Sequence, residues 1–236
     1  MRGLALPVDE RDCFPRRVLD KGEIPSEFRR STGLSEGTET IYCPPDQWGP
    51  RITPPTLIVA GTHSLLIERL LETRFDRTEI DYGAITNIQA GRILLYSWLI
   101  FEWQQSGGTS GQTTIEFNTV ASQLMLELLR RIRREAFPST MQEETDIGSG
   151  SEPAATPSST NPGPDVPRRL RLAWREVAFP EQPPVTAAYY PGDSVQHAGQ
   201  LIVLTDTEVV DIQALANSVW GSRNYGVQWT FLPVAS

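Results

Sequence analysis

Residues 56–67 return, with changed side chains, as residues 200–210. In both copies a three-residue apolar run, Leu57-Ile58-Val59 or Leu201-Ile202-Val203, meets a short polar corner, and a second apolar run follows. This pattern is typical of two strands joined by a tight turn. The repeat constrains the fold more than any other feature, because it predicts that one β unit is used twice.

Three further landmarks accompany the repeat in the same order. They are Tyr42-Cys43-Pro44 with Tyr189-Tyr190-Pro191, Leu65-Leu66 with Val209-Val210, and Tyr82-Gly83 with Tyr225-Gly226. The first tyrosine precedes the Tyr-Gly pair by 40 residues in one copy and by 36 in the other. We interpret this as a duplicated supersecondary unit. A half-barrel cannot cover its own apolar face, so we expect the second copy to pack on the first, by sheet extension or face to face, or to pair with another chain.

Composition describes an ordinary soluble protein of one or two domains. Hydrophobic residues make up 39% and charged residues 21% of the 236 residues. The net charge of -8 argues against a nucleic-acid binder that works through phosphate contacts. The longest apolar run, residues 93–101, is about half of the ~20 residues that a membrane helix needs. Pro7, Asp9 and Glu10 interrupt any secretory signal, so we expect a cytoplasmic protein.

Changes in composition predict four segments. Residues 1–38 are an N-terminal arm, and residues 39–137 form a barrel with a C-terminal helix. Residues 138–167 are an acidic, Pro/Ser/Thr-rich flexible linker, because such a segment buries too little apolar surface to offset its conformational entropy. Residues 168–236 contain the partial second unit.

Within the first unit we expect strands at 39–43, 57–59, 65–68, 79–88, 93–103 and 114–117. The strand at 93–103 is apolar on both alternating faces, which predicts cover on both sides. Residues 118–136 form an amphipathic helix with Asn118 or Thr119 as its cap. Its apolar stripe consists of Val120, Leu124, Leu128 and Ile132, widened by Ala121, Met125 and Leu129. Residues 168–176 alternate as a strand does, although a short helix is the alternative.

The end of the 118–136 helix carries the one dense basic patch of the sequence, Arg130, Arg131, Arg133 and Arg134. One interpretation is a solvated helix end. The other is contact with an acidic partner, or with Glu143, Glu144 and Asp146 of the linker.

The order of these elements resembles the bacterial pleckstrin-homology-like (PH-like) domains. Leu57-Ile58-Val59-Ala60 and Leu65-Leu66-Ile67 resemble the second and third strands of that family, Ile80-Asp81-Tyr82-Gly83 resembles its fourth, and residues 118–134 resemble its C-terminal helix. The resemblance implies a mainly β fold with one long helix: a PH-like split barrel at 39–136 and an incomplete second copy at 185–236. It also implies lipid binding, peptide binding or assembly as the role. The basic cluster that grips inositol phosphates in eukaryotic members has no counterpart here, since Arg51 and His63 are the basic residues between Tyr42 and Ile67.

No residue pattern predicts catalysis, a cofactor or a metal. His63 and His197 lie at different places in their repeats and in no metal-binding spacing. Asp76, Glu79 and Asp81 alternate with arginines, which is typical of a solvated hairpin. Gly107-Gly108-Thr109-Ser110-Gly111 lacks the ending of a phosphate loop. Cys13 and Cys43 have no paired spacing, so we expect two free thiols.

The sequence therefore predicts a non-enzymatic cytoplasmic module for protein interaction or assembly, with a protein partner or self-association. The first alternative is a lipid- or membrane-surface-binding module of the same fold, which predicts a basic or aromatic rim. The second is a small hydrolase or isomerase, which requires a pocket that holds acids or a histidine.

Overall fold

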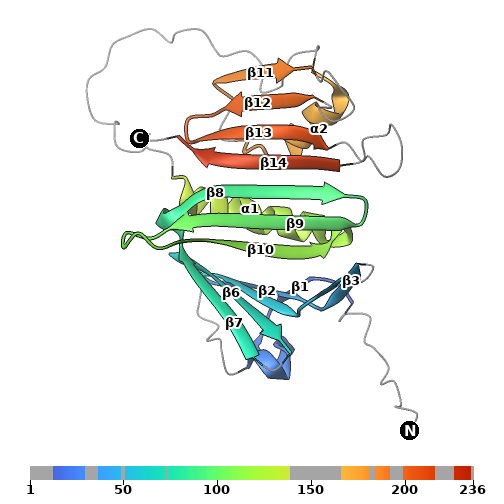
Figure 1. Cartoon of the computed structure of the whole chain (residues 1–236), viewed down its shortest axis with the longest axis vertical. Coiled ribbons are helices and arrows are strands. Elements are labelled where there is room, and N and C mark those ends of the chain that lie inside the picture. Colours follow the sequence, from blue (N-terminus) through green and yellow to red (C-terminus); the bar gives the residue numbers. More distant parts are fainter. Residues whose placement is uncertain are drawn as a thin grey trace. The chain divides into compact units, whose positions relative to one another are not determined.

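A computed structural model describes residues 13–29, 37–48, 51–72, 74–138, 166–180, 184–191, 199–215 and 226–234. The chain divides into two compact units, Met1–Ala136 and Phe137–Ser236. Each is mainly β, and one long helix, α1 (Ser122–Ala136), belongs to the first (Figure 1). Residues 139–165 of the acidic linker predicted at 138–167 lie outside the described residues, as do His197 and Tyr225.

The first sheet of unit 1 is an antiparallel meander with one added strand at its edge. Its order is β1 (Arg16–Val18), β2 (Glu39–Cys43), β5 (Thr56–Ala60), β6 (Ser64–Leu71) and β7 (Arg74–Asp81). The short pair β3 (Asp46–Trp48) and β4 (Arg51–Thr53) lies in the connection between β2 and β5. Strands β2 and β5 are buried on nearly every residue, because both faces of the sheet are covered there.

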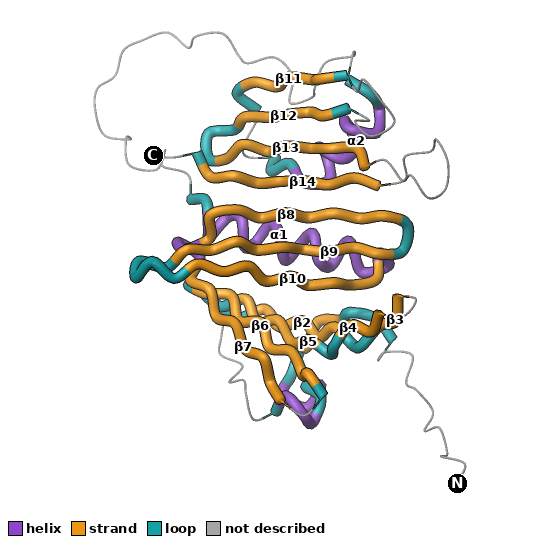
Figure 2. Tube along the Cα trace, viewed as in Figure 1, coloured by secondary structure: helices purple, strands orange, loops and turns teal. Residues whose placement is uncertain are grey.

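A second meander of unit 1 consists of β8 (Ile85–Ile93), β9 (Tyr96–Gln104) and β10 (Ser110–Asn118) (Figure 2). The hairpin between β9 and β10 turns at Gly108, whose φ of +81° suits glycine, so the predicted glycine-rich connection is confirmed. The chain then enters η5 (Thr119–Ala121) and α1. Asn118 is the cap, since its side chain accepts a hydrogen bond from the Val120 N–H at 3.1 Å.

Most of the predicted apolar stripe of α1 is buried, and Val120 is the exception. Met125, Leu128, Leu129 and Ile132 are buried, as expected for a helix that packs one face on a core. Val120, by contrast, is 67% exposed, because it lies in η5 before the α-helical period begins.

Unit 2 contains a four-stranded antiparallel meander and one helix. The strands are β11 (Thr186–Tyr190), β12 (Gln200–Leu204), β13 (Glu208–Leu215) and β14 (Gly226–Pro233), each hydrogen-bonded to the next. Helix α2 (Arg168–Val177) contacts β13, and the indole N–H of Trp229 in β14 donates to the Ala173 carbonyl. The alternation of β13, buried at every second residue, marks a sheet with one covered face.

The two meanders share one register. Tyr42 pairs with Leu57 as Tyr189 pairs with Leu201. The partners Val59 and Leu66 recur as Val203 and Val210. The turns also agree: the Gly61 N–H donates to the Ser64 carbonyl at 2.9 Å, and the Thr205 N–H donates to the Glu208 carbonyl at 2.9 Å. The two hairpins therefore have the same strand pairing and the same turn hydrogen bond, as the repeat in the sequence predicts.

The predicted correspondence of Tyr82-Gly83 with Tyr225-Gly226 is wrong. Tyr82 follows β7, and its N–H donates to the His63 carbonyl at 3.0 Å, whereas Gly226 begins β14 and pairs with Leu215. The residue that matches Tyr82 is Val234, whose N–H donates to Thr207 at 2.9 Å. Tyr82 follows its strand whereas Gly226 begins the equivalent strand, so the similarity of the two Tyr-Gly pairs is a coincidence of sequence.

The same face of each meander is covered, but by different elements. In unit 1 the segment that holds η2 (Lys21–Glu23) and η3 (Ser26–Phe28) packs Ile24 and Phe28 on Tyr42, Leu57 and Val59. In unit 2 α2 lies on the face of β13 that holds Val210 and Ile212. The predicted 1–38 arm is thus wrong for residues 16–28, which supply an edge strand and part of the core.

Three strand predictions also need correction. Residues 168–176 are a helix, because Leu170, Ala173, Trp174 and Val177 bury one helical face while Leu172 is 45% exposed. The strand predicted at 79–88 is two strands, separated by the turn η4 (Tyr82–Ala84). The strand predicted at 93–103 begins at Tyr96 and alternates between buried and half-buried residues, so its two faces are not equally covered.

Candidate functional site

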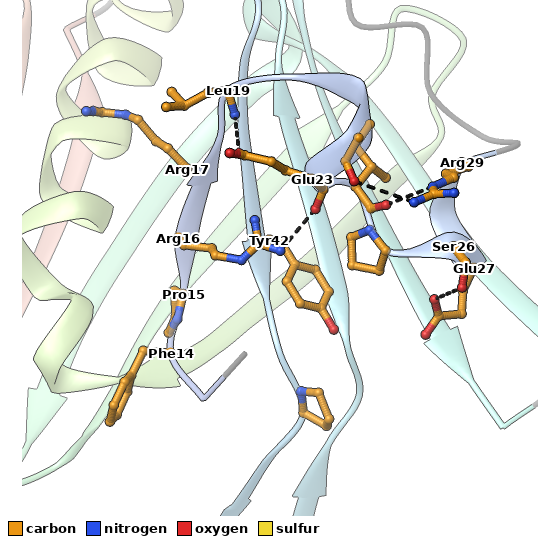
Figure 3. Close-up of a pocket in the computed structure, with 14 residues that line it drawn as sticks. Phe14, Pro15, Arg16, Arg17, Leu19, Glu23, Ser26, Glu27, Arg29 and Tyr42 are labelled. Atoms are coloured by element: carbon orange, nitrogen blue, oxygen red, sulfur yellow. Dashed lines mark hydrogen bonds between the residues drawn. The ribbon is translucent and has the colours of Figure 1, made fainter. Parts of the chain in front are cut away.

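An open cavity lies beside β1, η2 and η3 of unit 1, and we call it the N-terminal groove (Figure 3). Its volume is about 970 Å³. Its lining residues are Phe14, Pro15, Arg16, Arg17, Leu19, Gly22, Glu23, Ile24, Pro25, Ser26, Glu27, Arg29, Tyr42 and Pro45.

Two short turns, each set by local sequence, form the floor of this groove. The Asp20 carboxylate accepts hydrogen bonds from the N–H groups of Gly22 at 2.6 Å and Glu23 at 3.2 Å, which caps η2. Pro25 begins the next turn, where the Phe28 N–H donates to the Pro25 carbonyl at 2.9 Å. These two turns bend the chain back over the sheet and bring its arginines to one place.

Phe28 anchors the segment. It is fully buried, and its ring meets the rings of Tyr42 and Phe75 edge to face, with centroids 6.1 Å and 5.4 Å apart. Aromatic pairs favour this geometry. The groove therefore rests on a fixed support rather than on an isolated loop.

Backbone carbonyls orient two of the three arginines in the groove. Arg16 donates to the Glu23 carbonyl at 3.0 Å, and its guanidinium lies 5.5 Å from the centroid of the Tyr42 ring (Figure 3). Arg29 donates to the carbonyls of Ile24 at 3.2 Å and Gly22 at 3.5 Å. A carbonyl positions a guanidinium without cancelling its charge, so Arg29 keeps a net positive charge at the groove.

The third arginine ties the groove to the rest of unit 1. Arg17 pairs with Glu39 of β2 at 2.7 Å and with Glu127 of α1 at 2.8 Å. Hydrogen bonds to these two carboxylates hold the pKa of Arg17 above its ordinary value. Arg17 is therefore a structural tie, and Arg16 and Arg29 are the cations aimed at the cavity.

The rim of the groove is apolar and open. Leu19 is 80% exposed and Phe14 is 43% exposed. The Glu23 carboxylate accepts a hydrogen bond from the Leu19 N–H, and the Glu27 carboxylate accepts one from the Ser26 hydroxyl. Exposed apolar side chains beside oriented cations fit a ligand that carries both apolar groups and a carboxylate. The composition of residues 1–38 predicts an arm and does not indicate this groove. The Asp20-Lys21-Gly22 cap and Pro25 were the available local signs.

The four arginines that the sequence singled out do not form one exposed patch. Arg133 is 1% exposed and lies in the core. Arg131 donates to the carbonyls of Gly37 and Gly61 and lies 3.9 Å from Glu39. Arg130 is half-buried and Arg134 is exposed. Contact with an acidic partner stays a prediction for Arg130 and Arg134, while Arg133 is buried too deeply to take part.

The other chemical candidates of the sequence are placed as follows. Among the described residues no group of three His, Cys, Asp or Glu side chains could hold a metal ion. Asp76 pairs with Arg69 at 3.3 Å and Glu79 with Arg77 at 3.4 Å along β6 and β7. His63 lies in the turn between β5 and β6. Both cysteines are free thiols, as predicted, with Cys13 exposed and Cys43 buried.

Comparison with protein-family models, with curated proteins and with solved structures gives no match. Within the described part of the chain, no helix combines the length and the apolar character needed to cross a membrane.

Proposed function

We propose that the chain is a non-enzymatic protein-interaction module of PH-like fold, and that a partner segment binds in the N-terminal groove. The observation that carries this proposal is the pairing of exposed Leu19 and Phe14 with the carbonyl-oriented Arg16 and Arg29 around one cavity.

The element order supports the PH-like part of the proposal. A four-stranded meander (β2, β5, β6, β7) is followed by a three-stranded meander (β8, β9, β10) and a closing helix, α1. The family resemblance implies this order. The matched register of β11 to β14 supports a second copy that contains the first four strands alone.

The chemistry of the groove favours a peptide as the ligand. Three arginines and two glutamates line it, so its net charge of about +1 is small compared with the clusters that hold anionic membranes. Prolines and exposed apolar side chains suit a segment with alternating apolar and acidic residues. Arginine with an adjacent apolar contact is a frequent anchor in such interfaces.

A phage-displayed library of random 12-residue peptides, selected on the full chain, tests the proposal. We expect enriched peptides that combine Asp or Glu with Leu, Ile or Phe. Their binding should fall about tenfold or more when Leu19→Ser and Arg29→Gln are combined, because both the apolar and the charge-assisted contact are lost. Matched changes outside the groove, Val120→Ser and Arg134→Gln, should leave binding unchanged.

Two results would contradict the proposal. One is a set of peptides that bind the Leu19→Ser, Arg29→Gln variant as well as the original chain. The other is enrichment of no peptide together with salt-sensitive binding to phosphatidylserine vesicles, which would favour the membrane-binding alternative. Light scattering on both proteins shows in addition whether the groove mediates self-association, which a drop in mass of the variant would reveal.

A further inference from the structure

The outer face of the β8–β10 meander differs in kind from its inner face. Odd-numbered residues of β9, such as Leu99 and Phe101, are buried in the core of unit 1. Their even-numbered neighbours Tyr96, Trp98 and Ile100 point to the opposite face and are half-buried. Large aromatic side chains are therefore left partly open to solvent on a regular sheet surface.

Tyr96 and Trp98 form one aromatic platform. Their ring centroids are 5.4 Å apart and their planes differ by 30°. Trp98 lies across its cross-strand partner Gly91, where an added Cβ would come within 2.1 Å of the indole ring. Glycine at this position lets the indole lie flat on β8, which fixes the platform.

Two carboxylates flank the platform. Glu116 of β10 is the cross-strand partner of Trp98 and accepts a hydrogen bond from the Tyr96 hydroxyl. Glu102 is held by the side-chain amides of Asn87 at 3.1 Å and Gln89 at 3.4 Å. The register places no Lys, Arg or His on this face of the three strands.

We propose that this face binds an arginine-bearing segment of a partner protein, at a site separate from the N-terminal groove. A guanidinium is planar, so it stacks on Trp98 and Tyr96 while its edge donates to Glu116. The two acidic side chains and the aromatic π faces are complementary to positive charge. Ammonium groups fit less well, since lysine is more strongly hydrated and does not stack.

Arg69 is a basic side chain at the border of this arrangement. It lines a hollow of about 270 Å³ together with Glu116, Gln112 and Thr114. Its guanidinium is held by Asp76 at 3.3 Å and by the Thr114 carbonyl at 2.6 Å. Arg69 is thus fixed at the border of the site by its own partners.

Titration of the ¹⁵N-labelled full chain with a capped tetra-arginine peptide tests this proposal. We expect shifts of the Trp98 indole N–H and of the Gly91 and Glu116 amides. Affinity should fall about tenfold in Trp98→Leu and in Glu116→Gln, since a stacked or charge-assisted contact is lost in each. Tetra-lysine should bind more weakly than tetra-arginine.

Matched variants separate this site from general attraction to an acidic chain. Asp206→Asn removes one exposed carboxylate elsewhere and should leave the affinity unchanged. Gly91→Ala pushes on Trp98, whereas Gly111→Ala makes the same kind of contact with Trp103 on the inner face, at 2.4 Å. We expect Gly91→Ala to weaken binding of the peptide and Gly111→Ala to leave it unchanged, provided that both variants fold.

Equal losses in Asp206→Asn and Glu116→Gln would overturn the proposal, as would shifts confined to residues outside β8–β10. Binding of tetra-arginine with the same affinity to Trp98→Leu would do the same. If Gly91→Ala or Gly111→Ala does not fold, Trp98→Leu and Glu116→Gln still decide the question.

Discussion

The indole N–H of Trp229 donates to the backbone carbonyl of Ala173 at 3.0 Å, and both residues are 2% exposed. This bond joins β14 to α2 in the core of unit 2. Trp103 of unit 1 differs, because its indole N–H is buried and has no hydrogen-bond partner.

We therefore expect replacement by phenylalanine to reduce the free energy of unfolding by different amounts at Trp229 and at Trp103. Trp229→Phe should lower the free energy of unfolding by about 1–2 kcal/mol more than Trp103→Phe, since the first loses a buried hydrogen bond and the second removes an unsatisfied donor. Urea unfolding followed by circular dichroism measures both. Equal losses would show that ring volume, rather than the hydrogen bond, controls the cost.

The hairpin of unit 2 is fixed by a side chain that its counterpart lacks. The Thr205 hydroxyl donates to the Glu208 carbonyl at 3.1 Å and accepts from the Glu208 N–H at 3.1 Å, while the equivalent residue in unit 1 is Gly61. Thr205→Val should cost about 1–3 kcal/mol of stability, because the backbone of Glu208 loses both of its hydrogen bonds to the Thr205 hydroxyl. Asp206→Asn, an exposed change in the same turn, should stay within about 0.5 kcal/mol. Thermal unfolding of both variants checks the difference, and similar melting temperatures would contradict it.

The sequence predicted the parts of the fold that depend on local pattern. Alternating and continuous apolar runs placed the hairpins at Leu57 and Leu201, and the caps and period of residues 118–136 placed α1. It was wrong where two patterns fit equally well. Leu170, Leu172 and Trp174 match a strand, but Leu170, Trp174 and Val177 match a helix, and packing against β13 decides between them.

The candidate site could not be predicted in the same way. Arg16, Arg29 and Tyr42 line one cavity because Phe28 packs on Tyr42 of the meander, a contact between residues far apart in the sequence. Composition suggested an arm for this segment, since its charges and prolines are also typical of loops. In the same way a dense run of arginines suggested a surface patch, although helical geometry turns Arg133 into the core.

The two cysteines should differ sharply in reactivity. Burial raises the pKa of the Cys43 thiol to about 12, whereas Cys13 is exposed. Because the thiolate is the reactive form, Ellman's reagent at pH 8 should modify Cys13 in the folded chain and Cys43 only after unfolding. Cys13→Ser should therefore show no fast-reacting thiol. Rapid reaction of both thiols in the original chain would contradict the buried placement of Cys43.

The same shift predicts a loss of stability at alkaline pH. The pKa of Cys43 is raised in the folded chain. The buried thiol therefore contributes fully to the free energy of unfolding below the ordinary thiol pKa of about 8.5, and this contribution is lost as pH rises toward the folded pKa. Cys43→Ala removes this part of the pH dependence. Unfolding free energies of both proteins between pH 7 and about pH 10.5 measure it, and parallel curves would contradict the prediction.

Glu127 should show the opposite dependence at acidic pH. Hydrogen bonds from the Gln123 amide at 2.9 Å and from Arg17 at 2.8 Å hold the pKa of Glu127 below its ordinary value. Because the folded pKa is lowered, the stabilisation is present above the ordinary glutamate value of about 4.3 and is lost as pH falls through the folded pKa. The pair is well exposed, so the effect on stability is small and the titration itself is the better measurement.

Carboxyl ¹³C shifts of Glu127 should give a higher pKa in Gln123→Ala and in Arg17→Gln than in the original chain. Ser26→Ala, which leaves both contacts in place, should not move it, and an unchanged titration in the first two variants would show that neither contact persists in solution.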